Sequence, residues 1–152
     1  MRHLTFAAAL IALFATPLSG CASDGGHWVE VAGERYAVEV AADDAARARG
    51  LMFRDAMPRD HGMLFIHEQE APQAYWMKNT RIALDILYFD GQRRLVSQQR
   101  DVPPCALGDR CPAYPSRAPA LYVLELNAGE AARIGLEDGT QMQFGPGIPG
   151  GR

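Results

Sequence analysis

The clearest evidence for the fold class lies in residues 82–96, which read IALDILYFDGQRRLV. Residues 82–89 are mostly apolar and are rich in the residue types that favour β-strands. The dipeptide Asp90-Gly91 is a strong hairpin signal, because the tight turns that join antiparallel strands favour these residues. We therefore expect a strand over residues 82–89, a turn, and an antiparallel partner strand that begins at Leu95.

Short strands and two short helices are expected on both sides of this hairpin. The first helix has Asp43 and Asp44 at its start, where carboxylates cap free N–H groups, and Gly50 at its end. The second helix begins with a capping-box pattern formed by Asn127 and Glu130. This mixture predicts an α+β fold with a mostly antiparallel, partly closed, barrel-like sheet and two short helices. The other expected strands are residues 28–31, 36–40, 62–67, 74–77, 120–126 and 140–144, and the expected helices are residues 45–50 and 128–134.

The length and composition fit one compact domain. The chain has 152 residues, of which 48% are hydrophobic and 22% are charged, and these values exclude a disordered chain or a fibre. A net charge of −3 argues against a nucleic-acid partner, because phosphate neutralisation requires a basic stripe. We expect a monomer with a globular domain over residues 28–144 and a flexible, glycine- and proline-rich tail over residues 145–152.

Residues 1–20 are predicted to form a signal peptide. Met1-Arg2-His3 is a short positive start, and an uncharged, mostly apolar run follows over residues 4–15. As a helix this run is about 18 Å long, which is shorter than the ~30 Å hydrocarbon core that a transmembrane helix must cross. The segment is therefore expected to direct export rather than to span a membrane.

The segment LSGC, residues 18–21, resembles the cleavage box of bacterial lipoproteins. In such proteins the cysteine carries diacylglycerol and an acylated amine, so that two or more acyl chains anchor the protein. Residues 21–27 then form a lipidated tether that holds the domain on the periplasmic side of the cell envelope. Ala22 in place of an aspartate after Cys21 favours the outer membrane. The alternative is an ordinary secretory cleavage after Ala22, which gives a soluble periplasmic or secreted protein.

The cysteine count agrees with a lipid anchor. Three cysteines are an odd number for a secreted protein, and lipid on Cys21 leaves Cys105 and Cys111 as a pair. An oxidising periplasm allows these two to form a structural disulfide. A zinc site is less favoured, because two thiolates need further ligands and no His or Cys cluster lies nearby in the sequence. The spacing is also not the Cys-x-x-Cys of redox enzymes.

Several short motifs occur in a characteristic order along the chain. They are RGLM at 49–52, GMLF at 62–65, WMKNT at 76–80, LD at 84–85, VPPC at 102–105, YP at 114–115 and YVLEL at 122–126. The ordered set resembles a bacterial and archaeal family catalogued as domain of unknown function 192. The resemblance covers roughly residues 28–144 and implies a compact, strand-rich, often secreted domain. It implies no reaction, substrate or cofactor.

The segment at 76–80 is the most unusual for chemistry. Lys78 is the single lysine in a chain that otherwise uses arginine, which indicates that the shape or proton chemistry of an ammonium group matters there. Strand alternation places Trp76 and Lys78 on one face. Asp85 lies on the next expected strand, so we expect a Lys78–Asp85 ion pair with Asn79 in the same ligand-binding group. The structural alternative has Trp76 in the core, Lys78 snorkelling and Asn79 in a turn.

Arg49 and Glu125 complete the candidate ligand-binding residues. Arg49 is expected to pair with Glu125 or to bind an anionic ligand, and the ordinary alternative is a solvated or structurally paired arginine. These residues favour a small-ligand-binding or envelope-accessory module, with a small molecule or glycan as its ligand. The alternative is an enzyme of unknown reaction that uses Lys78 as base or nucleophile, assisted by Asp85 or Glu125.

No metal or cofactor is expected to bind. His61 and His67 are six residues apart, which separates them by about 20 Å on one strand. The sequence has no HExxH motif, phosphate-binding glycine loop or serine nucleophile elbow. Its scattered methionines are expected in the core rather than as copper ligands.

Overall fold

The structure, a computed structural model, describes residues 26–150. The predicted signal peptide and the lipidation site at Cys21 lie outside the described residues. Within residues 26–150, no helix is long and apolar enough to cross a membrane.

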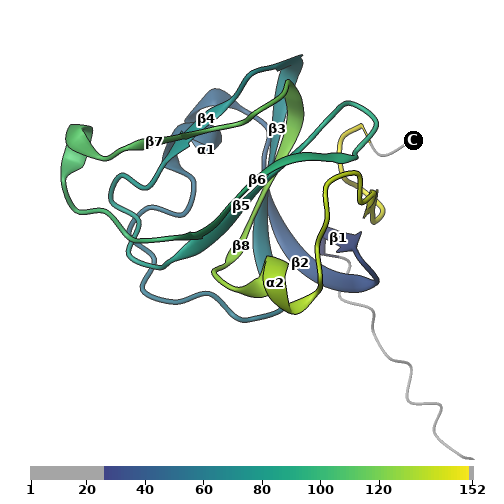
Figure 1. Cartoon of the computed structure of the whole chain (residues 1–152), viewed down its shortest axis with the longest axis horizontal. Helices are drawn as coiled ribbons and strands as arrows, with labels where there is room; N and C mark the ends of the chain where they lie inside the picture. The colour runs from purple at the N-terminus through teal and green to yellow at the C-terminus, as the bar shows by residue number, and fades with distance from the viewer. Residues whose placement is uncertain (1–25, 151–152) are drawn as a thin grey trace, which may run out of the picture.

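Seven strands form the main sheet, in the order β6-β5-β8-β3-β2-β1-β9 (Figure 1). Every neighbouring pair is antiparallel except β2 and β3, which run parallel. A second sheet pairs β4 (Ala74–Trp76) with β7 (Ala113–Pro115), and the helices are α1 (Asp44–Arg49), the 3-10 turn η1 (Gly108–Arg110) and α2 (Glu130–Arg133). The strands of the main sheet are β1 (Trp28–Val31), β2 (Glu34–Ala41), β3 (His61–Ala71), β5 (Leu84–Phe89), β6 (Leu95–Val102), β8 (Ala120–Asn127) and β9 (Met142–Phe144).

The two ends of the main sheet approach each other. The N–H of Leu95, at the start of β6, donates to the carbonyl of Thr140, and the N–H of Gly139 donates to the carbonyl of Leu95, at 2.8 and 2.7 Å. A further bridge joins Arg94 to Gln141, just before β9. The sheet is therefore curled into a half-barrel, which confirms the predicted α+β fold with a mostly antiparallel, partly closed sheet.

Strand β5 shows why this sheet has apolar side chains on both faces. All six residues of β5 are buried. Alternate side chains point to opposite faces of a strand, so Leu87 and Phe89 enter one core cluster and Ile86 and Tyr88 enter the other. The first cluster lies on the face that α2 covers, and the second includes residues of α1 and β4. The candidate site lies on the second face.

The predicted capping box at Asn127 is wrong. Asn127 is the last residue of β8, and its side chain donates to the carbonyls of Met57 and Pro58, both at 3.1 Å. Helix α2 begins later, after Gly129, whose φ of +85° suits glycine. The strand therefore extends through the residue that the sequence pattern assigned to the helix start.

The segment after β9, where a flexible tail is predicted, begins with residues that pack against the domain. The N–H of Gly145 donates to the carbonyl of Trp28 at 2.8 Å, which continues the pairing of β9 with β1. Ile148 is buried in the first core cluster. The packed domain therefore extends beyond the predicted limit at residue 144.

Candidate functional site

A cavity of about 30 Å³ lies beside α1 and β4, over the second face of the main sheet. This volume accommodates one or two water-sized groups. Among the residues of its wall, six bear on function: three cations, one acid and two of the three aromatic residues that line it. They are Arg47, Arg49, Lys78, Tyr75, Trp76 and Glu125.

Helix α1 brings two arginines to the cavity. The carboxylate of Asp43 accepts the N–H of Ala46 at 2.8 Å and starts the helix, as the sequence predicts. Gly50 ends it with a φ of +45°, and a Cβ there would lie 3.4 Å from the ring of Phe65. The guanidinium of Arg47 donates to the carbonyls of Ala42 and Ile66, both at 2.8 Å, and thereby fixes α1 against β3.

The alternation predicted for residues 76–78 is confirmed. Met77 is fully buried, whereas Trp76 and Lys78 both line the cavity. The Lys78 ammonium lies 4.9 Å from the centre of the Trp76 ring, within the range of a cation–π interaction. Trp76 is 45% exposed, so the alternative that placed it in the core is wrong.

Glu125 is the acid of the cavity and the most unusual group in it. It lies in the middle of β8, opposite Met63 of β3 and Ile86 of β5, and is 4% exposed. No side-chain hydrogen bond within residues 26–150 reaches its carboxyl group. Burial raises the pKa of Glu125 to about 8, and within residues 26–150 no cation of the cavity wall lies within ion-pair distance of its carboxyl group. At pH 7 the group is therefore mostly protonated and uncharged, and its O–H is available as a donor.

Tyr75 forms the aromatic wall next to Glu125. Its ring makes edge contacts with Phe65 and Tyr88, at centroid distances of 5.0 and 6.0 Å. Its hydroxyl lies 2.9 Å from Nε2 of His67, and burial, with a smaller contribution from Glu125, raises the pKa of Tyr75. Burial also lowers the pKa of His67. A shallower hollow of about 240 Å³ lies beside His67 and shares Tyr75 and Trp76 with the cavity.

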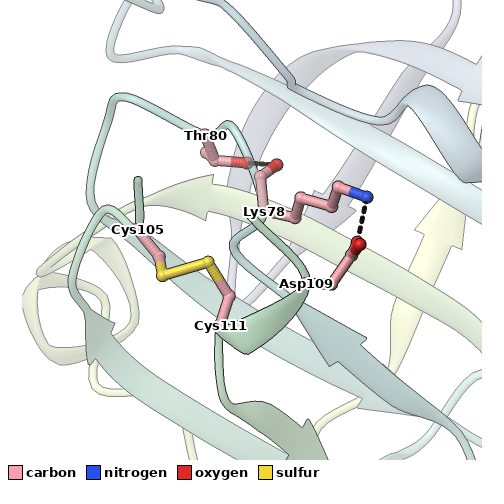
Figure 2. The surroundings of a disulfide bond; sticks show 5 residues. All are labelled: Lys78, Thr80, Cys105, Asp109 and Cys111. Carbon is pink, nitrogen blue, oxygen red and sulfur yellow. Dashed lines mark hydrogen bonds and ion pairs between the residues drawn. A yellow bond between two sulfur atoms is a disulfide. The ribbon is translucent and has the colours of Figure 1, made fainter. Parts of the chain in front are cut away.

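The predicted disulfide between Cys105 and Cys111 is present and holds a loop against the site (Figure 2). The N–H of Cys105 donates to the carbonyl of Thr80 at 3.3 Å, and Cys105 also pairs with Lys78 as an isolated parallel bridge. Between the two cysteines, the carboxylate of Asp109 forms an ion pair with the ammonium of Lys78. The loop thus supplies the carboxylate that faces Lys78.

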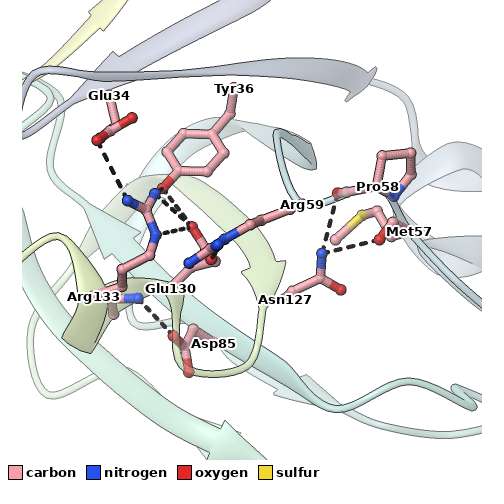
Figure 3. A network of polar contacts seen from close by, with 10 residues as sticks. Glu34, Tyr36, Met57, Pro58, Arg59, Asp85, Asn127, Glu130 and Arg133 are labelled. Carbon is pink, nitrogen blue, oxygen red and sulfur yellow. Dashed lines mark hydrogen bonds and ion pairs between the residues drawn. The ribbon is translucent and has the colours of Figure 1, made fainter.

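The predicted ion pair between Lys78 and Asp85 is wrong. The two carboxylate oxygens of Asp85 accept the backbone N–H groups of Asp101 and Ala131, each at 2.8 Å. Figure 3 shows Asp85 beside the network around Glu130 and Arg133. Asp85 precedes Ile86 in β5, and adjacent side chains of a strand point to opposite faces. Since Ile86 points to the cavity face, Asp85 points to the α2 face, away from the cavity. Its carboxylate is a structural cap for α2.

Asn79 also lies outside the cavity wall. It has a φ of +56°, and its carbonyl accepts the N–H of Phe53 at 2.8 Å. Asparagine tolerates this left-handed conformation better than most residues. Of the two alternatives for Asn79, a ligand-binding residue or a turn residue, this geometry agrees with the turn.

Four of the six candidate ligand-binding residues therefore line one cavity. They are Arg49, Trp76, Lys78 and Glu125. Arg49 and Glu125 do not form the ion pair that was one expectation. Arg47 and Tyr75 also line the cavity but were not predicted from the sequence. Arg47 stands two residues before Arg49 in a helix with both start and stop signals, but nothing in the sequence distinguishes it from a solvated arginine.

The family profile described as an uncharacterized ACR, domain of unknown function 192, matches residues 27–144. This match spans most of the chain. The chain belongs to this family. The match includes all six residues of the cavity wall named above.

Two solved structures of related proteins share this fold. One, from Sinorhizobium meliloti 1021 and provisionally named a transcription regulator, is 34% identical with a TM-score of 0.72, over 78% of this chain and 92% of that one. The other, a protein of unknown function from Novosphingobium aromaticivorans DSM 12444, is 32% identical with a TM-score of 0.71, over 76% of this chain and 83% of that one. The comparison with curated proteins finds no match.

Proposed function

We propose that this protein is a small-ligand-binding module of the bacterial cell envelope, and that its ligand enters the cavity over Glu125. The observation that carries the proposal is the carboxyl group of Glu125, which lines the cavity and has no hydrogen-bond partner among residues 26–150. Its oxygens are not sealed in the core, because no fully buried side-chain oxygen of these residues lacks a partner. They are therefore open to a ligand in the cavity. A perturbed titratable group in a concave site is a standard indicator of function.

The surroundings of Glu125 support binding of a polar ligand. Arg47 and Lys78 place positive charge on the cavity wall, although Asp44 and Asp109 pair with them from the outside. Within the described residues, Arg49 makes no ion pair. Trp76, at the edge of the cavity, offers an exposed apolar surface for the rest of a ligand.

The position of the cavity fits the proposed lipid anchor at Cys21. Strand β1, which follows the predicted tether, lies at the opposite end of the molecule from α1, β4 and β7 (Figure 1). A chain anchored at its amino terminus would therefore present the cavity away from the membrane. Mass spectrometry of the mature amino terminus tests the anchor, because an unlipidated terminus at Ser23 contradicts it.

The binding proposal is tested by a thermal-denaturation screen against periplasmic metabolites and glycan fragments. A ligand that binds the folded state raises the melting temperature by mass action. We expect Glu125→Leu, which removes the polar group, to abolish the response, whereas Glu68→Leu, the same exchange on an exposed part of β3, leaves it unchanged. A response that is identical in wild type and Glu125→Leu, or no response to any compound, contradicts a ligand site at Glu125.

An enzyme is the second candidate function, and the pKa of Glu125 favours it. A carboxyl group with a pKa near the working pH can act as a general acid or base, and Lys78 stands in the same cavity wall. Asp85 cannot assist, because its carboxylate caps α2 on the other face. Mass spectrometry of a compound identified in the screen separates the two functions. Turnover that is lost in Glu125→Gln supports an enzyme, whereas an unchanged compound supports a binding module.

The provisional name of the Sinorhizobium protein is not transferred to this chain. A net charge of −3 lacks the excess of basic residues that phosphate neutralisation requires.

A further inference from the structure

We propose that the ligand presents a carboxylate group to this cavity, and that it binds only while Glu125 is protonated and donates a hydrogen bond to it. This inference rests on the proposed function, since it names the chemical class of the ligand for the same site. It also couples binding to the protonation of Glu125. A surface cluster of arginines, which stay charged at all relevant pH values, would bind an anion without such coupling.

The charges around the cavity select against a cationic ligand. Arg47 and Arg49 face it from α1, and Lys78 faces it from the segment after β4. The acids that pair with Arg47 and Lys78, Asp44 and Asp109, are on the solvent side, with 98% and 84% of their side chains exposed. An amine in this cavity would therefore lie beside three positive groups.

The protonated carboxyl group of Glu125 offers the interior of the cavity a hydrogen-bond donor rather than a negative charge. Glu125 interacts electrostatically with Tyr75 of β4 and Tyr88 of β5, and burial raises the pKa of both. The Tyr75 hydroxyl is hydrogen-bonded to His67 of β3, and the Tyr88 hydroxyl donates to the carbonyl of Tyr114. Of these three hydroxyl groups, the O–H of Glu125 is thus the one left to donate to a ligand oxygen.

The size of the cavity favours a carboxylate over a larger anion. A volume of about 30 Å³ accommodates one or two water-sized groups, which matches the two oxygens of a carboxylate. One oxygen would accept from Glu125 in the interior, and the negative charge would be balanced by Arg49 and Lys78 at the edge. Charge-assisted hydrogen bonds of this kind are stronger than neutral ones.

Asp109 is a built-in competitor for the same cation. Its carboxylate contacts Lys78, and the disulfide between Cys105 and Cys111 keeps the loop that carries it beside the site. A ligand carboxylate would replace Asp109 at Lys78. We therefore expect Asp109→Asn to bind the ligand more tightly than wild type.

The pH dependence of affinity has a defined sign. Above a pKa of about 8, Glu125 is ionised in the free protein, and an ionised Glu125 neither donates to a carboxylate nor tolerates one nearby. Each pH unit above that value should therefore weaken binding tenfold, and each carboxylate bound there should take up one proton. Below pH 7 the affinity should be constant.

Acetate, which is ionised throughout this range, is a suitable probe. Its dissociation constant is measured by NMR titration of the oxidised mature protein from pH 6 to 10, at constant ionic strength and without carboxylate buffers. We expect a tenfold weakening per unit above pH 8 in wild type and in Glu68→Gln. Glu125→Gln, whose amide also donates, should bind acetate without this pH dependence, and Asp109→Asn should bind it several-fold more tightly than wild type.

Calorimetry provides a second measurement that needs no variant. Acetate binding at pH 9, in two buffers of different ionisation enthalpy, should show uptake of nearly one proton, against almost none at pH 6.5. A pH-independent affinity, the same pH dependence in wild type and Glu125→Gln, or no acetate binding at any pH overturns the inference. Binding of acetamide as tight as that of acetate overturns it too, but leaves the proposed function intact. An empty result from the metabolite and glycan screen overturns both.

Discussion

Two buried glutamates, five residues apart in the chain, have opposite environments. Glu125 is 4% exposed and has no hydrogen-bonding partner for its carboxyl group within the described residues, whereas Glu130, at 5% exposure, accepts from Arg59, Arg133 and Tyr36 (Figure 3). Burial raises the pKa of Glu125 to about 8, and the hydrogen bond from Arg133, with others, lowers that of Glu130 to about 2. Two glutamates that are equally buried can therefore differ in protonation state and in role, depending on their hydrogen-bond partners. Glu130 joins α2 to β2 through its hydrogen bonds, whereas Glu125 is the glutamate that we propose for a ligand.

The largest expected effect is on the pH dependence of folding stability. In the unfolded chain Glu125 has its ordinary pKa of 4.5, so its contribution to stability is fully present below that pH and is lost as the pH rises to about 8. Glu125→Gln removes this loss. We expect the stability of the variant relative to wild type to rise between pH 5 and 8, by a total on the order of 3 kcal/mol.

Urea denaturation of both proteins at pH 5, 6, 7, 8 and 9 measures this difference. Glu68→Gln should show no such trend, because Glu68 is exposed. A constant difference between wild type and Glu125→Gln across the series would mean that Glu125 is ionised at neutral pH, and the comparison with Glu130 would fail.

The same isosteric change at Glu130 should have the opposite sign. A glutamate with a lowered pKa contributes stability above its unfolded value of 4.5, and that stability is lost as the pH falls through about 2. Arg59 and Arg133 are partly exposed, so solvent screens part of the attraction. We expect Glu130→Gln to cost about 2 kcal/mol at pH 7, mainly through weaker charge-assisted hydrogen bonds.

This second variant is measured in the same urea series, extended down to pH 2. The difference from wild type should shrink as the pH approaches 2, where Glu130 itself becomes protonated. A variant as stable as wild type at pH 7 would show that the network of Glu130 contributes nothing to the fold.

The sequence predicted the strands well and the faces of the strands poorly. The mostly apolar run at residues 82–89 indicated a strand, of which residues 84–89 form β5, and the Asp90-Gly91 turn indicated its antiparallel partner. Since β5 is buried on both faces, however, alternation carried no signal about which face Asp85 would choose. Glu125, in a β8 that is also buried on both faces, posed the same difficulty.

Residues that typically start or end a helix predicted helix bounds correctly where no strand pairing competed for the same residues. Asp43 and Gly50 correctly bounded α1. Asn127 and Glu130 have the spacing of a capping box, but Asn127 pairs with Leu84 in the sheet, and tertiary pairing prevails over a local cap. The alternation at Trp76 and Lys78 was readable because one face of that segment is exposed and the other is buried.

The disulfide should make an intermediate contribution to folding stability. Because it lies on the cavity side of the sheet, it should not affect the Glu130 network on the α2 side. Cys105 and Cys111 are six residues apart, and closing so short a loop contributes about 2 kcal/mol in the chain-entropy model. We expect Cys105→Ser/Cys111→Ser to lose about this much stability in urea denaturation, with the pH dependence at Glu130 unchanged. A loss of stability several times larger would mean that the loop between the two cysteines is part of the core and does not merely pack beside the cavity.

The smallest expected effect is at Lys78, although it is the residue that the sequence marks most clearly. Its ammonium contacts Asp109, whose side chain is 84% exposed, and exposed ion pairs contribute about 0–1 kcal/mol. Lys78→Ala should therefore lower stability by less than about 1 kcal/mol, and Lys78→Arg by still less. Both are measured by urea denaturation, with Arg81→Ala, which removes another surface ion pair, as the control. A loss of about 3–5 kcal/mol would indicate a buried, uncompensated partner, and Lys78 would then belong with Glu130 among the structural groups. If stability is instead unchanged while acetate binding is lost, the single lysine serves the ligand and not the fold.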